Sequence, residues 1–180
     1  AKIAGIKLCE ALNKQYGFDS ISLMPTNLYG PGDYYHPENS HVIPSFIRRF
    51  QEAAIHNVKE VICWGSGEPL REFLYVEDLS DACRFVLENW KPEKDKINYL
   101  NVGMGKDISI RELADMIAYK TGYKGTIKWD KSKPDGTPKK QLNITKLKKL
   151  GWSPKINLDK GLDQTINFYK SSIENNSLRS

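Results

Sequence analysis

The chain has 180 residues, 39% of them hydrophobic and 27% charged, with a formal net charge of +5 and a pI near 9.0. This composition is typical of a globular domain with its own core, and no apolar run is long enough to predict a membrane span. The positive charge is spread along the sequence without a dense block, so it suits an anionic ligand and does not favour nucleic acid or a membrane as partner.

The cysteines point to a reducing compartment. Cys9, Cys63 and Cys83 lie in apolar patterned segments and lack the CxxC spacing of metal or redox sites. They are therefore expected to be reduced core thiols of a cytoplasmic protein.

The first segment, "AKIAGIKLCEALNKQYG", has apolar residues at helical spacing and predicts a helix over residues 1–17 that ends at Gly17. The helix starts at residue 1 without an N-cap, which suggests a chain cut from something longer. "ISLMP", residues 21–25, predicts a short buried strand. A loop rich in Gly, Pro, Asn and Tyr is expected from residue 26 to 40, before a helix over about 42–56.

The remainder alternates strand and helix patterns. Apolar runs bounded by turn residues predict strands over residues 61–64, 71–75, 97–103 and 126–130. Helical spacing predicts helices over residues 78–90, 109–122, 145–150 and 157–173, and the tail from residue 174 is expected to fray. In the second of these helices Ser109 and Glu112 form a capping box and Gly122 is the C-cap.

This alternation predicts an α/β architecture. The irregular spacing and long loops favour the last strands of a doubly wound sheet joined to a small α/β cap, rather than a complete sheet. Loops of this length inside a compact domain are more often functional than idle.

His41 is the first candidate for chemistry. An imidazole exchanges protons near neutral pH, so it can act as an acid or a base. His41 lies where the long loop meets the helix, and Ser40 or Asn39 is expected to cap that helix. The alternative is an ordinary polar residue at a helix start, and His36 and His56 are expected to be surface residues.

Four further side chains are candidates for ligand binding, and arginines that converge on one face would form an anion site. Arg49 and Arg71 carry guanidinium groups that pair with phosphate or carboxylate oxygens. Trp64 follows a buried strand and precedes Gly65, so it is either core or a flat stacking surface. Asp135, in "KPDGTPKK", belongs either to a basic surface turn or to a lid that contacts ligand hydroxyls.

Several signatures are missing from the sequence. There is no GxGxxG, no P-loop, no GxSxG elbow and no cluster with metal-ligand spacing. The residues alone thus predict an anion-binding substrate lobe that lacks its own nucleotide cradle and binds no metal.

Six segments together resemble one enzyme family. They are "AKIAGIKLCE", "MPTNLYGP", "HPENSHVIPSFIRRF", "WGSGEPLREFLYVEDL", "NVGMGKDISIRELA" and "KPDGTPKKQL". They resemble the GDP-L-fucose synthases, within the extended short-chain dehydrogenases/reductases, and the resemblance runs from residue 1 to about 169. "REFLYVEDL" is shared more widely among nucleotide-sugar epimerases and dehydratases.

The resemblance implies an NAD(P)-binding Rossmann-type fold of which only the last part is present. Residues 1–30 would be the remnant of the dinucleotide-binding domain, and residues 31–180 mainly the substrate-binding α/β domain. Lys2 matches the lysine of the family's YxxxK motif, whose tyrosine would precede residue 1. Lys2 would bind the nicotinamide ribose and assist catalysis, and the cofactor would be NADP.

The resemblance also assigns the other site residues. Pro25, Thr26, Asn27 and Leu28 would follow the nicotinamide half of NADP, and His41 would contact the cofactor and act as the catalytic acid. The residues expected to hold the GDP-sugar are Arg49, Trp64, Arg71 and Asp135.

The implied reaction is 3,5-epimerisation and then 4-keto reduction of GDP-4-keto-6-deoxy-D-mannose, by a homodimer when intact. The alternatives are another nucleotide-sugar epimerase, reductase or dehydratase, and a non-catalytic GDP-sugar-binding fragment.

Overall fold

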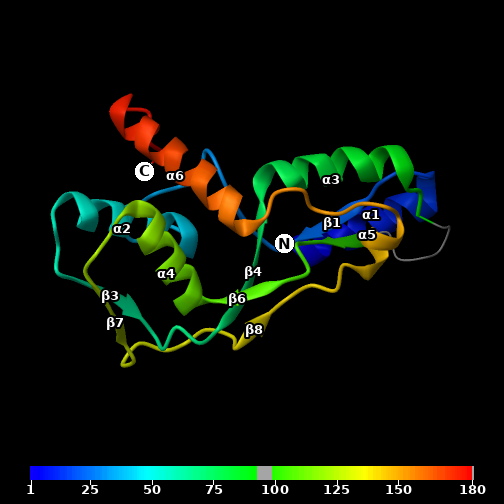
Figure 1. The fold of residues 1–180 in the computed structure, drawn as a ribbon. Helices are drawn as coiled ribbons and strands as arrows, with labels where there is room; N and C mark the ends of the chain where they lie inside the picture. The colour runs from blue at the N-terminus through cyan, green and yellow to red at the C-terminus, as the bar shows by residue number, and fades with distance from the viewer. Residues whose placement is uncertain (93–98, 180) are drawn as a thin grey trace.

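The computed structural model describes residues 1–92 and 99–179 (Figure 1). Its helices are α1 (Lys2–Tyr16), α2 (Val42–Ile55), α3 (Val76–Asn89), α4 (Ile110–Thr121), α5 (Thr145–Lys149) and α6 (Leu158–Glu174). Its strands are β1 (Ser22–Pro25), β2 (Asn27–Tyr29), β3 (Glu60–Trp64), β4 (Leu70–Tyr75), β5 (Tyr99–Val102), β6 (Asp107–Ser109), β7 (Thr126–Asp130) and β8 (Lys139–Lys140). The predicted α/β class is confirmed.

The strands form three small sheets. β1 pairs in parallel with β5, and β3 pairs in parallel with β7. β4 is the hub of the third sheet, where it pairs in parallel with β2 and β8 and antiparallel with β6. β4 therefore connects the part of the molecule that contains α2, α4, β3 and β7 with the part that contains α1, α3, α5 and β1 (Figure 1).

Most predicted elements are found, and three short strands are present that were not predicted. They are β2, β6 and β8, and each has two or three residues whose pairing depends on β4. A pattern of two or three residues carries too little periodicity to predict a strand. Of the strand expected over 97–103, residues 97 and 98 lie outside the described part of the chain.

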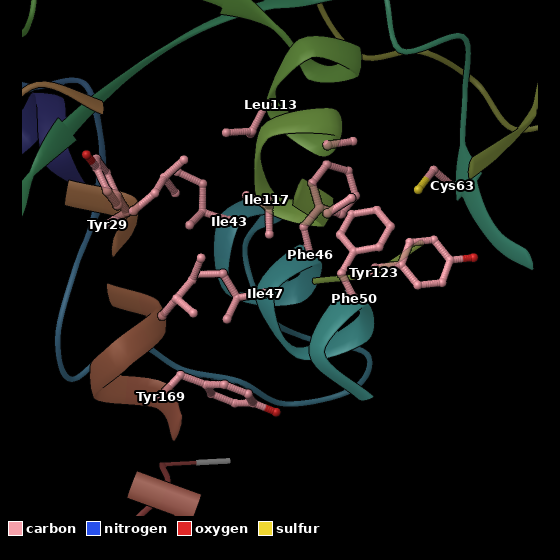
Figure 2. Packing of buried hydrophobic residues seen from close by; sticks show 14 of the residues in the cluster. Tyr29, Ile43, Phe46, Ile47, Phe50, Cys63, Leu113, Ile117, Tyr123 and Tyr169 are labelled. Atoms are coloured by element: carbon pink, nitrogen blue, oxygen red, sulfur yellow. The ribbon is translucent and has the colours of Figure 1, made fainter. Parts of the chain in front are cut away.

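The main core lies among α2, α4 and α6 (Figure 2). Figure 2 shows Ile43, Ile47 and Phe50 of α2 facing Leu113 and Ile117 of α4. All five side chains have at most 1% of their surface exposed. They recur at helical spacing, so the apolar faces of α2 and α4 pack against each other and fix where α2 begins.

A second core lies beneath α3. Leu74 of β4, Val86 of α3, Leu100 of β5 and Trp152 are buried together, with Leu23 of β1 packed against them. Residues from both predicted domains thus share this core, and the predicted division at residue 30 stays a prediction. Unlike the helices that cover these cores, α1 has no buried residue.

Residues 178 and 179 of the C-terminal tail contact the rest of the protein, so the fraying expected from residue 174 is not found there. Leu178 packs against the main core, and the carbonyl oxygen of Arg179 accepts a hydrogen bond from the Tyr35 amide at 3.0 Å. The polar composition of the tail hid these contacts, because their partners lie far away in the sequence.

Candidate active site

A cleft of 620 Å³ lies between β2, the start of α2, the end of β3, β4 and the loop over residues 134–136. The sequence-predicted site residues that line it are Thr26, Asn27, Leu28, His41, Trp64, Arg71 and Asp135. Side chains that are far apart in the sequence are thus brought together in one concave site, as expected of a ligand-binding site.

The main chain of β4 holds Thr26 and Asn27 at the edge of the cleft. Thr26 Oγ1 and Asn27 Nδ2 both donate to the carbonyl oxygen of Glu72, at 3.1 and 2.8 Å. The Thr26 amide donates to the carbonyl of Val102 at 3.0 Å, where the chain passes from the β1–β5 sheet to the sheet around β4. Residues 26–28 therefore follow the carboxyl end of a parallel strand, where ligands bind in open α/β sheets.

Glu72 supports this edge from within the protein, and it was not among the predicted site residues. Its side chain is fully buried; Oε1 accepts from the Gly105 amide at 2.6 Å and Oε2 from the Leu142 amide at 2.8 Å. A Cβ on Gly103 would lie 2.4 Å from Oε1. Glu72 thus joins β4 to two other segments. An acidic residue within a buried strand was the signal that could have revealed it.

His41 lies at the N-cap position of α2. Its carbonyl accepts from the Ser45 amide at 2.9 Å, but within the described chain its imidazole makes no capping hydrogen bond. The expectation that Ser40 or Asn39 caps the helix is therefore wrong, because the helix begins one residue later than a Ser40 cap requires and two residues later than an Asn39 cap requires. The imidazole is exposed and lines the cleft, so capping does not occupy it.

Asp33 is a lining residue that the sequence analysis missed. Its carboxyl group is half-buried in the cleft, and its Oδ1 accepts from the Tyr34 amide at 2.8 Å. Burial raises the pKa of Asp33, while the Tyr34 hydrogen bond and the charges of His41 and Arg179 lower it. The cleft thus contains an acidic group within electrostatic reach of His41. The "PGD" turn gave no sign of this arrangement.

The turn after β3 and the loop after β7 are tied together by Asp135. Its Oδ1 accepts from the Ser66 amide at 2.8 Å and its Oδ2 from the Ser66 hydroxyl at 2.6 Å, and these bonds lower the pKa of Asp135. Gly65 has φ +80°, and a Cβ there would lie 2.3 Å from Asp135 Oδ1. Only glycine therefore permits this close approach.

Trp64 and Arg71 supply an aromatic face and a cation. The Trp64 side chain is 74% exposed in the cleft, with Lys133 Nζ 5.6 Å from the ring centroid. Arg71 Nη1 donates to its neighbour, the Leu70 carbonyl, at 2.7 Å, which leaves other guanidinium N–H groups for a ligand. A flat ring and positive charges in one cleft suit a ligand that combines a planar group with anionic oxygens.

Three predicted residues are not among the lining residues of the cleft. Lys2 is the exposed first residue of α1, and Pro25 ends β1 next to Thr26. Arg49 points from α2 to β3, where its guanidinium donates to the carbonyl of Ile62. The roles predicted for these three residues stay predictions.

Residues 1–92 and 99–179 contain neither a metal-binding cluster nor a membrane-spanning helix. No group of three or more His, Cys, Asp or Glu side chains is placed to hold a metal ion. No helix in those ranges has both the length and the apolar character needed to cross a bilayer.

Comparison with known proteins gives concordant matches. A sequence profile described as "NAD dependent epimerase/dehydratase family" matches residues 1–103. GDP-L-fucose synthase 1 of Arabidopsis thaliana is 50% identical over 175 residues, or 97% of this chain and 53% of that protein. GDP-L-fucose synthase of Escherichia coli K12 is 52% identical over 177 residues, or 94% of this chain and 54% of that protein.

The chain spans about half the length of the curated relatives it matches. Among solved structures, a GDP-6-OMe-4-keto-L-xylo-heptose reductase from C. jejuni has a TM-score of 0.86 at 31% identity. That match covers 94% of this chain and 59% of the reductase chain. The similarity in fold therefore extends over most of the chain.

Proposed function

Since the chain belongs to the NAD dependent epimerase/dehydratase family, we propose that it is the substrate-binding half of a GDP-L-fucose synthase. Such an enzyme epimerises GDP-4-keto-6-deoxy-D-mannose at C3 and C5 and then reduces C4 with NADPH. The resemblance found in the motifs is confirmed by the curated relatives. The observation that carries the proposal is the cleft, because it is lined by His41, the segment 26–28 and three of the four residues expected to bind the GDP-sugar.

NADP fits the residues on one side of the cleft. Thr26, Asn27 and Leu28 line it after the end of a parallel strand, and the contacts with Glu72 hold this segment in place. Together with Lys2 and Pro25 they would hold the nicotinamide half of the cofactor. When bound, NADPH supplies the hydride for reduction of the C4 ketone.

His41 would exchange protons at C3 and C5. A proton beside the C4 ketone is acidic, because the carbanion charge spreads onto the ketone oxygen. A positioned imidazole can return a proton to such a carbon as general acid. The exposed ring of His41 lines the cleft together with the carboxyl group of Asp33, and this placement fits the role.

The opposite side of the cleft would bind the GDP-sugar. The exposed ring of Trp64 offers a stacking surface for the base or the sugar, and Arg71 offers hydrogen bonds for the diphosphate. Asp135 can accept from sugar hydroxyls with lone pairs that Ser66 leaves unused. Arg49 joins this set only if its guanidinium leaves the Ile62 carbonyl when the ligand binds.

GDP binding is the first test. We expect calorimetry to detect GDP binding by the chain as it stands and Arg71→Ala to weaken it about tenfold or more, because a charge-assisted contact is lost. Arg84→Ala is the matched control, since Arg84 lies on α3 and pairs with its acidic neighbours Asp81 and Glu88. Equal binding of UDP and GDP, or no binding of either, would contradict the proposed substrate class.

Catalysis needs a second test. The chain can be joined to the remaining half of the E. coli relative and supplied with GDP-4-keto-6-deoxymannose and NADPH in D₂O. His41→Gln should abolish deuterium incorporation at C3 and C5. GDP binding without any NADPH consumption would instead support the non-catalytic fragment.

We also propose that the intact protein is a cytoplasmic homodimer, as the resemblance implies. A reducing compartment is consistent with the cysteines, since Cys9, Cys63 and Cys83 are free thiols. Light scattering of the intact protein tests the dimer: a monomeric mass at micromolar concentration would contradict it.

A further inference from the structure

The end of the chain returns to the segment that precedes His41. Asn176 has a left-handed φ of 51°, and the Ser177 amide donates to the Ser172 carbonyl at 2.9 Å, so the chain turns back after α6. Leu178 then packs against the main core, and the Arg179 carbonyl accepts from the Tyr35 amide at 3.0 Å. The tail is thereby attached to the loop between β2 and α2.

The side chain of Arg179 begins a stack of flat groups. Its guanidinium carbon lies over the ring of Tyr34, 5.9 Å from the ring centroid. The Tyr34 ring stacks on the ring of His36 at 5.6 Å, with an angle of 14° between the planes. A guanidinium over an aromatic face is favourable, and two stacked rings further limit each other's movement.

His36 connects this stack to the main chain of the loop before α2. Its Nδ1 accepts hydrogen bonds from the amides of Glu38 and Asn39, at 3.1 and 3.2 Å. A continuous series of contacts thus runs from Arg179 to Asn39, which lies shortly before His41. A change in the orientation of the His36 ring would alter the path of the chain that delivers His41 to the cleft.

The charge of Arg179 also reaches the cleft. Burial raises the pKa of the Asp33 carboxyl, and Arg179 and His41 are both among the groups that lower it. Asp33 therefore lies within electrostatic reach of both residues, and Asp33 and His41 line the same cleft. The charged groups that share the cleft with them are Arg71 and Asp135.

We propose that Arg179 is a positioning residue of the active site, which acts through Tyr34 and His36 on the loop that carries His41. The inference rests on the proposed function only for the catalytic role of His41. The contacts themselves can be tested without substrate or cofactor.

Amide hydrogen exchange, read by NMR on the whole chain, is the direct test. In Arg179→Ala the amides of Glu38 and Asn39 should exchange about three- to fivefold faster, because the stack that orients their acceptor is lost. Amides within α4 should be unchanged, which distinguishes this local effect from general destabilisation. Arg84→Ala, which removes an exposed arginine from α3, should leave all of these amides unchanged.

Two substitutions of His36 separate the ring from its acceptor atom. His36→Phe keeps a stacking ring but removes Nδ1, so the Glu38 and Asn39 amides should exchange faster. His36→Asn keeps an acceptor oxygen near the position of Nδ1 but loses the ring. Because the stack is lost, its Glu38 and Asn39 amides should also exchange faster than in the native chain, and adding Arg179→Ala to it should have no further effect.

The outcomes distinguish the two proposals. Unchanged exchange at residues 38 and 39 in Arg179→Ala would overturn the positioning role, whether or not the chain binds GDP. So would an equal effect of Arg179→Ala in the native and His36→Asn backgrounds. Failure of the chain to bind GDP, with the exchange pattern as expected, would instead refute only the proposed function.

Discussion

Replacing Glu72 with glutamine should destabilise the fold far more than its small change in shape suggests. Glu72 is fully buried and accepts one amide hydrogen bond on each carboxyl oxygen, from Gly105 at 2.6 Å and Leu142 at 2.8 Å. Glutamine has one acceptor oxygen, and its NH₂ group would face the second amide with donor against donor. The variant therefore loses one strong bond and leaves a buried N–H without an acceptor.

The expected loss is about 3 kcal/mol, since a hydrogen bond to a charged group contributes ~1.5–3 kcal/mol and an orphaned buried donor costs ~1–3 kcal/mol. Urea unfolding at neutral pH, followed by the fluorescence of the four tryptophans, should show a midpoint lower by about 1.5 M if the slope is about 2 kcal/mol/M.

Glu88→Gln is the control, because Glu88 is exposed on α3. If Glu72→Gln unfolded at the same urea concentration as Glu88→Gln, the buried-acceptor reasoning would be refuted.

Three further substitutions probe other parts of the structure. Gly65→Ala should cost about 1 kcal/mol or more because alanine is strained at positive φ, and its displacement of Asp135 should make the loop after β7 more sensitive to protease. Ser109→Ala should lower the free energy of unfolding by ~1 kcal/mol in urea, through loss of the side-chain cap of α4. Lysine and tryptophan hydrogen bonds lower the pKa of Asp81 in the folded state, so Asp81→Asn should reduce stability at neutral pH. The difference in stability between the variant and the native chain should shrink as the pH falls below 3.8, the ordinary pKa of the group, and then through the lower pKa of Asp81 in the folded state. A difference that does not depend on pH would contradict this origin.

The helices were predicted well because their signals are local. The capping box of Ser109 with Glu112 and the left-handed C-caps at Gly17 and Gly122 are all found. Such signals require only neighbours within one turn of helix. By contrast, β2, β6 and β8 exist only through their pairing with β4, which no local pattern reveals.

The site was predicted in part. His41, Trp64, Arg71 and Asp135 share the cleft, and the resemblance rather than spacing selected them together. Arg49 illustrates the limit of sequence proximity: an α-helix rises ~1.5 Å per residue, so Arg49 lies ~12 Å along α2 from His41.

Glu72, Asp33 and Arg179 were missed for a common reason. Their importance lies in partners that are distant in sequence, such as Leu142 for Glu72 and Tyr35 for Arg179. Asp33 and Arg179 look like ordinary charged residues until the chain is folded, and only Glu72 carried a signal, as an acidic residue within a buried strand.

The acceptors around the cleft imply an uneven tolerance to sequence change. Thr26 and Asn27 donate to a peptide carbonyl, and so does the guanidinium of Arg49, whose acceptor belongs to Ile62. Every residue type has a main-chain carbonyl, so the residue at position 62, which is 52% exposed, can be replaced by other strand-forming residues without loss of that contact. Thr26, Asn27 and Arg49 donate through their side chains, so replacing one of them removes its hydrogen bond. Substitutions in this region should therefore accumulate at the residues that supply a carbonyl and not at the residues that supply the side-chain donor.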